Sequence, residues 1–314
     1  TKYKDANEFL VNGASREYKS AWWNAQRMKP ESILSTKDDF LRLYEETPDY
    51  EYFPTGVDGL DDKMLGIHKG ALTIVLAPTG IGKTEFMRYL EWQCYSNSPY
   101  SFAMCHLEET QLRSLLGLVS YDLGMNLTRK DLVESSGAEQ QVKESLERIA
   151  QQEKVYQFSF RTDDSVDDLI ENIRFLVTAM GVDYVFLEPV QDVVTGDVSN
   201  KESLLTDLTN KLKRLAPEIN VGIVVIAHAN EEGDPKYARS IVQGAAYEIK
   251  LDRNPDAEEE HERNTMHVHV GRKNRTGGGS GYAGALTFDS RTYMLTPEVA
   301  PVFDSGDVVE GVGF

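Results

Sequence analysis

The stretch LTIVLAPTGIGKT, residues 72–84, decides the fold of this chain. It opens with an apolar run that predicts a buried β-strand at 72–76, and a loop with two glycines, Ala77 to Thr84, follows directly. The next residues, near 84–96, carry apolar side chains at helical spacing. A strand, a glycine-containing loop that ends in Lys-Thr and a helix, in this order, predict a loop that holds phosphate groups.

Each part of this loop has a physical task at a bound nucleotide. Backbone amides and the positive end of the following helix converge on phosphate oxygens, and we assign these amides to Thr79, Gly80, Ile81 and Gly82. Lys83 adds a positive charge at the β and γ phosphates, and the Thr84 hydroxyl is a ligand for Mg²⁺. The first loop position is Ala77 instead of the usual glycine, which the backbone tolerates because a methyl group is small. We therefore expect Mg²⁺ as cofactor and ATP, or another NTP or dNTP, as substrate.

The rest of the chain predicts an α/β fold. Apolar runs alternate with helical segments: the runs lie at 72–76, 101–105, 184–187 and 222–227, and the helical segments near 84–96, 109–122, 140–152, 165–180 and 202–216. Continuous apolar strands separated by helices are typical of a mainly parallel twisted sheet with helices on both faces. The alternation at 266–270 and 284–295 predicts antiparallel strands, and the acidic patch 256–263 predicts a solvated loop.

Polar residues follow three of the predicted strands, at the edge where an open α/β sheet places its chemistry. Glu188 directly follows the strand at 184–187 and is the candidate second Mg²⁺ ligand. The usual residue at this position is Asp. The longer side chain of Glu188 either reaches the metal through a bridging water or weakens metal binding. Glu108 follows the strand at 101–105 and is the candidate base that orients water, and Glu109 is assigned to the start of the next helix. The alternative for Glu108 is a helix N-terminal acid. His228 ends the strand at 222–227 and is the candidate sensor of the γ phosphate.

Composition narrows the classes of protein that remain. The 314 residues include 33 basic and 51 acidic side chains, a formal charge of −18, and 40% of them are apolar, which excludes wholesale disorder. No apolar run approaches the roughly 18 residues of a membrane span, so we expect no membrane partner. Two cysteines in apolar surroundings favour a reducing compartment, the cytoplasm. This net negative charge argues against nucleic acid binding over the whole protein surface, but it allows a local patch of basic residues that binds nucleic acid. The first residues form neither a signal peptide nor an obvious natural start, which leaves open that the chain is a fragment.

Three regions are predicted along the chain. Residues 1–52 are predicted to form an arm of short helices interrupted by prolines, with an aromatic pair at Trp22 and Trp23. Residues 53–298 are predicted to form the nucleotide-binding domain. Residues 299–314 are predicted to form an acidic tail that ends in Phe314.

The motifs together resemble those of the RecA-like ring helicases, and within them the helicase half of phage primase-helicases, the Twinkle-like type. The likeness rests on the loop at 77–84, the strand ends at Glu108, Glu188 and His228, the run RKNRTG at 272–277 and the run TGVDGLDDKMLG at 55–66. Residues 4–8 resemble the closing motif of a primase TOPRIM domain. The resemblance covers nearly the whole chain.

This resemblance implies a homo-hexameric ring with nucleotide bound between subunits. It implies that Arg275 is an arginine finger for the neighbouring subunit, with Lys273 pointing the same way along an extended strand; the alternative is that both are surface charges. It also implies that Phe288 stacks on the nucleotide base, and the alternative is a core residue of a strand. It also implies DNA-binding loops, in which the available cations are Lys201, Lys236 and Arg239. The second of these loops matches the family poorly.

The implied partners are single-stranded and forked DNA, a primase domain, and a DNA polymerase or single-strand-binding protein that docks on the acidic tail. Docking of the arm on an adjacent subunit is a further implication; the alternative is an arm packed on its own domain. We therefore expect an NTP-dependent replicative DNA helicase, in the host cytoplasm if the chain is phage-encoded. Two alternatives stay open: a RecA-like recombinase or clock-type assembly ATPase without unwinding, and a nucleotide-binding module that has lost hydrolysis.

Overall fold

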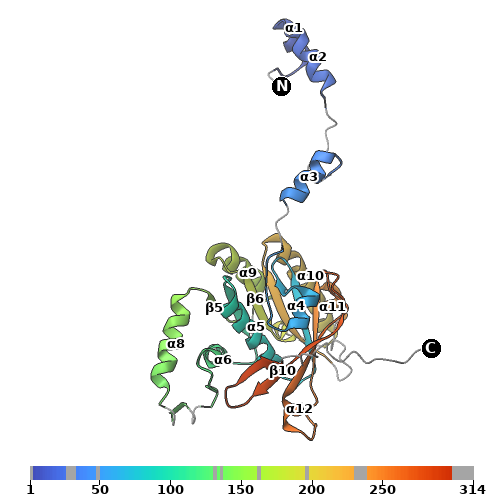
Figure 1. The fold of residues 1–314 in the computed structure, drawn as a ribbon. Helices are drawn as coiled ribbons and strands as arrows, with labels where there is room; N and C mark the ends of the chain where they lie inside the picture. The colour runs from blue at the N-terminus through green and yellow to red at the C-terminus, as the bar shows by residue number, and fades with distance from the viewer. Residues whose placement is uncertain are drawn as a thin grey trace, which may run out of the picture. The chain divides into compact units, whose positions relative to one another are not determined.

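The computed structural model describes residues 3–25, 33–46, 50–129, 133–134, 137–160, 164–194, 198–229 and 239–298, with only the backbone at 198–200 and 239–240. The chain forms two compact units, Thr1–Asp49 and Tyr50–Phe314. Figure 1 shows the fold from the N-terminus to the C-terminus. Among the described residues, no helix is both long and apolar enough to cross a bilayer.

The first unit consists of short helices with little buried surface. They are α1 (Ala6–Val11), α2 (Ser15–Trp23) and α3 (Lys37–Glu46). Asp5 begins α1, because its carboxylate accepts a hydrogen bond from the Glu8 amide at 2.9 Å. Phe9 is buried against the rings of Tyr3 and Tyr18, whereas none of the residues of α2 and α3 is buried.

The second unit is built on a sheet that has nine strands within the described residues. Their order is β11-β10-β9-β8-β3-β7-β6-β4-β5. Six strands run parallel: β8 (Tyr247–Asp252), β3 (Leu72–Ala77), β7 (Gly222–His228), β6 (Tyr184–Glu188), β4 (Phe102–His106) and β5 (Val155–Gln157). Three antiparallel strands extend one edge: β9 (Thr265–Val270), β10 (Gly281–Asp289) and β11 (Met294–Pro297). The predicted mainly parallel α/β fold is confirmed.

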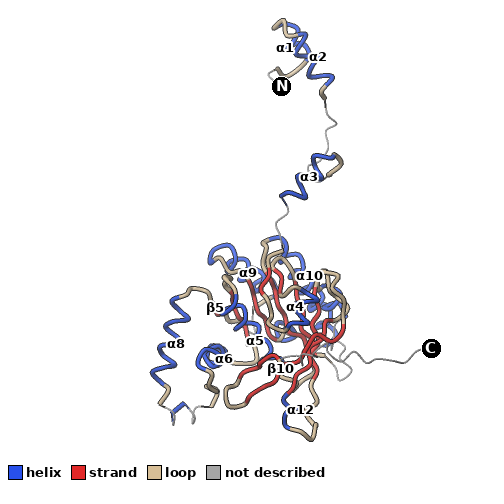
Figure 2. Tube along the Cα trace, viewed as in Figure 1, coloured by secondary structure: helices blue, strands red, loops and turns tan. Residues whose placement is uncertain are grey.

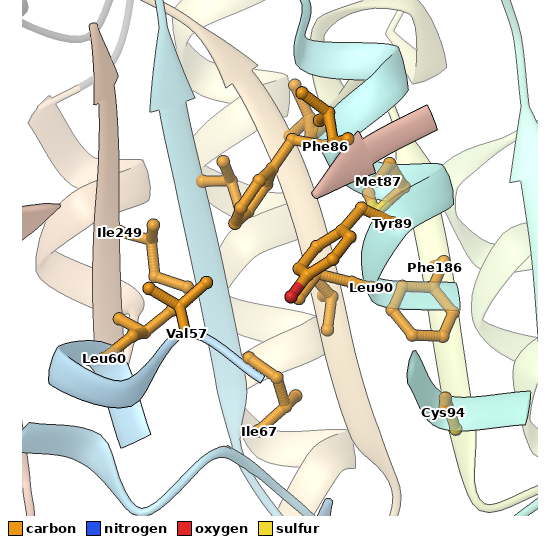
Figure 3. Packing of buried hydrophobic residues seen from close by; sticks show 14 of the residues in the cluster. Val57, Leu60, Ile67, Phe86, Met87, Tyr89, Leu90, Cys94, Phe186 and Ile249 are labelled. Carbon is orange, nitrogen blue, oxygen red and sulfur yellow. The ribbon is translucent and has the colours of Figure 1, made fainter. Parts of the chain in front are cut away.

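Helices cover both faces of this sheet, as Figure 2 shows in blue against the red strands. One face packs against α4 (Asp58–Met64), α5 (Lys83–Asn97), α6 (Gln111–Leu123) and α8 (Glu139–Gln151). The other packs against α9 (Val166–Met180), α10 (Val198–Glu218) and α11 (Arg239–Gly244). Figure 3 shows the first core, where Phe86 and Leu90 of α5 lie against strand residues such as Phe186 and Ile249. Because α5 is fixed on the sheet by this packing, its first turn sits at the end of β3.

The structure corrects several local predictions. The acidic patch at 256–263 is not wholly loop, because α12 (Glu260–Asn264) forms there. The predicted strand at 284–295 is two strands, β10 and β11, joined by a turn in which Tyr293 has a φ of 61°. Several elements were not predicted from the sequence. They are the two-stranded antiparallel sheet of β1 (Tyr52–Phe53) and β2 (Ile67–His68), the helices α4 and α11, the 3-10 helix η1 (Val190–Val193), and the parallel strands β5 and β8.

Candidate functional site

The phosphate loop has the geometry that its sequence predicts. β3 ends at Ala77, and α5 begins at Lys83. Gly80 and Gly82 have φ angles of 82° and 103°, a backbone region that side chains disfavour, and Gly82 is the N-cap of α5. The turn therefore aims the free amides at the start of α5, and the positive end of its dipole, toward the space above the loop, as phosphate binding requires.

Thr84 and Glu188 form a direct pair beside the loop. The Thr84 hydroxyl donates to Glu188 Oε1 at 2.5 Å, although 104 residues separate the two in sequence. Glu188 is the last residue of β6 and only 2% exposed, and its Oε2 has no hydrogen-bond partner among the described residues. Burial raises the pKa of Glu188 to about 7. Two oxygen donors, one with unused lone pairs, fit Mg²⁺, which keeps other coordination positions for water and phosphate.

Glu108 and His228 form a second pair near the loop, and Glu108 lines the same pocket as Thr84 and Glu188. The Glu108 side chain is 50% exposed, and its Oε1 is 3.8 Å from His228 Nε2. The register pairs Ala77 of β3 with His228 of β7, so this histidine is next to the start of the phosphate loop. Burial lowers the pKa of Lys83, and the carboxylates of Glu108 and Glu188 oppose that shift. The structure thus brings all five predicted residues, Lys83, Thr84, Glu108, Glu188 and His228, to one edge of the sheet.

Phe288 and Arg253 lie beside the phosphate loop. Phe288 lines a cavity of about 50 Å³ together with Gly82 and Arg253. Arg253 Nη2 donates to the Gly80 carbonyl at 2.7 Å, and its Nε is buried without a hydrogen-bond partner among the described residues. Arg253 was not predicted from the sequence, because it follows a strand, β8, that the apolar pattern did not indicate.

Lys273 and Arg275 lie far from the phosphate loop of their own chain. They sit in the loop between β9 and β10, not on an extended strand as expected. The Arg275 charge acts on Tyr247, the first residue of β8, and Tyr247 pairs with Thr73 near the start of β3. Because the phosphate loop begins after Ala77, four residues further along β3 than Thr73, these cations are displaced from its start by roughly 13 Å along the strand.

The proposed DNA contacts are only partly described. Lys201 is half-buried in the first turns of α10. Arg239 is the first residue of α11, and its side chain lies outside the described residues, as do Lys236 and the tail at 299–314.

A buried charged cluster next to the site was not predicted from the sequence. His106 lies between two carboxylates, with Nε2 2.8 Å from Glu91 and Nδ1 3.0 Å from Glu109. Arg88 of α5 donates to Glu109 at 2.5 Å and to Glu85. The nearby carboxylates raise the pKa of His106 to about 10, although burial alone would lower it. The hydrogen bond from His106 and the charge of Arg88 lower the pKa of Glu109 to about 2, although burial alone would raise it. Glu109 therefore does not start α6, whose N-cap is Thr110; it anchors the loop before it.

This fold and its phosphate loop are of the RecA-like P-loop type. Residues 53–242 match the family model of the DnaB-like helicase C-terminal domain, and the chain belongs to this family. It is 26% identical over 315 residues to the DNA helicase/primase of Enterobacteria phage T3, covering 94% of this chain and 55% of that protein, so the chain spans about half the length of this relative.

Two solved structures share the fold at low identity. The first is an ATPase domain, which superposes with a TM-score of 0.67 at 16% identity, over 84% of this chain and 98% of that one. The second is a KaiC-like protein from Pyrococcus horikoshii, which superposes with a TM-score of 0.58 at 15% identity, over 80% of this chain and all of that one. The predicted family and fold class are confirmed.

Proposed function

We propose that this chain is the motor part of a ring-shaped replicative DNA helicase, which hydrolyses an NTP or dNTP, moves along single-stranded DNA and opens the duplex at a fork. Membership of the DnaB-like helicase family supports this proposal. The observation that carries it is the convergence of Lys83, the Thr84–Glu188 pair and the Glu108–His228 pair at one sheet edge.

Each side chain of this group has one role in hydrolysis. Glu108 orients the attacking water and accepts its proton, because it is the carboxylate that is both exposed and close to the loop. Lys83 and the loop amides stabilise the negative charge on the transferred phosphoryl group, and His228 donates to the γ phosphate. Thr84 and Glu188 hold Mg²⁺, which when bound neutralises phosphate charge. The second oxygen of Glu188 remains available for this purpose.

The position of Arg275 supports a site shared between copies. A chain cannot bring Arg275 to its own γ phosphate, since the two occupy opposite ends of the parallel strands. Arg275 is exposed, so a neighbouring copy can approach it. We assign to it the stabilisation of charge on the neighbour's nucleotide, with Lys273 beside it, and hence a closed ring of six copies.

The surfaces of α3 and of the α6–α8 pair support assembly through the arm. Phe40, Leu43 and Tyr44 of α3 are all more than half exposed. α6 and α8 border a groove of about 560 Å³ whose lining is mostly apolar. An amphipathic helix from a second copy suits such a groove, because burial of both apolar surfaces stabilises the contact.

The remaining partners are proposed on the sequence alone. Lys201, Lys236 and Arg239 contact phosphates of single-stranded DNA in the ring channel. The acidic tail docks a polymerase or a single-strand-binding protein, residues 4–8 connect to a primase domain, and the complex works in the host cytoplasm.

A forked-DNA unwinding assay tests the function directly. The purified chain should separate the strands only with Mg²⁺ and a hydrolysable nucleotide, and K83A should abolish both hydrolysis and unwinding. R275A should keep nucleotide affinity but stop turnover, and a mixture of R275A with K83A should recover activity, since some interfaces then combine an intact loop with an intact arginine.

The other outcomes identify the alternatives. Brisk hydrolysis without strand separation would replace the proposal by a recombinase-type or clock-type ATPase. The lack of any phosphate release in the presence of single-stranded DNA would replace it by a nucleotide-binding assembly module.

A further inference from the structure

Glu109, the residue after the proposed base Glu108, is held by donors from three elements. Arg88 of α5 donates to its Oε2 at 2.5 Å. The Ser114 hydroxyl of α6 donates to its Oε1 at 2.9 Å, and the His106 ring at the end of β4 lies 3.0 Å from the same oxygen. The Glu109 side chain is only 9% exposed. A buried carboxylate with these partners fixes the short loop that carries it.

Arg88 is the centre of this anchor. It lies one helical turn after Thr84 on α5 and is 1% exposed. Its guanidinium also donates to Glu85 and lies over the Tyr293 ring, 5.6 Å from the centroid. On α6, a Cβ added at Gly117 would stand 2.3 Å from Arg88 Nε, so α6 has room for the arginine only because this residue is glycine. Arg88 thus joins the helix of the phosphate loop to the loop that carries Glu108.

Glu108 itself is placed by the backbone of that loop. Its side chain is half exposed, and its Oε1 lies 3.8 Å from His228 Nε2, which is beyond a hydrogen bond. Its neighbours Leu107 and Glu109 are fixed on either side, and the Leu107 amide donates a hydrogen bond to the Glu188 carbonyl at 2.7 Å. The direction of Glu108 therefore depends on how firmly these neighbours are held.

We propose that Glu109 and Arg88 are positioning residues that hold Glu108 over the phosphate loop and set its distance from the attacking water. The inference rests on the proposed function and deepens it. Catalysis by a positioned base falls by about 100-fold for a displacement near 1 Å. Nucleotide binding depends on Lys83 and the loop amides, which the anchor does not touch.

The expected result for E109L is a kcat lower by about 10- to 100-fold with KM within about twofold of the wild type. E109Q has the same shape and keeps one oxygen acceptor for these donors, so it should recover part of the lost turnover. G117A should also lower kcat, because the added Cβ pushes Arg88 aside without deleting a charge. Alanine has a higher helix propensity than glycine, so a loss of α6 helicity would not explain this result.

D183N is the matched control for these variants. Asp183 is a partly buried carboxylate at the opposite ends of β4 and β6, where it accepts from Lys69 at 2.7 Å and from the Ser101 amide at 3.0 Å. D183N should lower the thermal unfolding midpoint as E109L does but leave kcat unchanged. A purely structural role of Glu109 would give both variants the same kinetic behaviour.

A double variant separates positioning from an independent role. In the E108Q background there is no base to position, so E108Q/E109L should hydrolyse at the residual rate of E108Q. A further loss by the factor seen for E109L alone would overturn the inference. So would a wild-type kcat in both E109L and G117A, or a raised KM with unchanged kcat. If the wild type does not hydrolyse nucleotide, the proposed function and this inference both fail. If the wild type hydrolyses nucleotide but the variants behave as just described, only this inference fails.

Discussion

Replacing Glu188 by glutamine should remove a large pH dependence of stability from the nucleotide-free and metal-free protein. The folded structure raises the pKa of this carboxyl from 4.5 to about 7 through burial. Between these values the native state binds more protons than the unfolded state, so the free energy of unfolding falls as pH rises. This change in pKa corresponds to roughly 3 kcal/mol of stability, most of which is lost between pH 5 and pH 8.

Urea unfolding at several pH values, in the presence of a chelator, measures this effect. Trp92 packs against the core of the second unit and reports its unfolding by fluorescence. The stability of the wild type relative to E188Q should fall by roughly 2–3 kcal/mol from pH 5 to pH 8, because glutamine still accepts a hydrogen bond from Thr84 but does not ionise. Mg²⁺ with a non-hydrolysable nucleotide should reverse much of the fall, since the cation favours the charged carboxylate. If the stability of the two proteins changes with pH in the same way, the proposed burial and raised pKa of Glu188 are wrong.

Three further predictions concern packing and base recognition. R88M should lower the free energy of unfolding by about 3–5 kcal/mol, because it leaves buried carboxylates unpaired. R174M breaks an exposed ion pair and should lower it far less, so equal losses in urea titrations would contradict the burial of Arg88. G66A should cost at least about 2 kcal/mol in the same assay, since Gly66 has a φ of 124° and a Cβ there would stand 2.2 Å from the Phe53 carbonyl; an unchanged midpoint would contradict this geometry. F288A should weaken nucleotide affinity about 5- to 100-fold in equilibrium titrations, which corresponds to the binding free energy of one base stacked on an aromatic ring. An unchanged affinity would mean that Phe288 only packs in the core.

The phosphate loop and the parallel core were predictable because their signals are local. A buried parallel strand needs an uninterrupted apolar run, and a phosphate loop needs glycine, lysine and a hydroxyl at fixed spacing, so 72–84 predicts β3 and the start of α5 together. The convergence of Glu108, Glu188 and His228 was also predictable, because the carboxyl ends of parallel strands share one edge of the sheet.

The sequence by itself thus determined the fold class and the identity of the residues that meet at the nucleotide site. Only the tertiary structure decided that Arg88, 21 residues before Glu109, pairs with it, because such contacts depend on how α5 and α6 pack and not on any spacing. It also decided that Arg253 reaches the Gly80 carbonyl and that Arg275 lies at the far end of the strands from its own loop. Long-range pairs of this kind leave no periodic trace in the chain, since each partner alone looks like an ordinary charged residue.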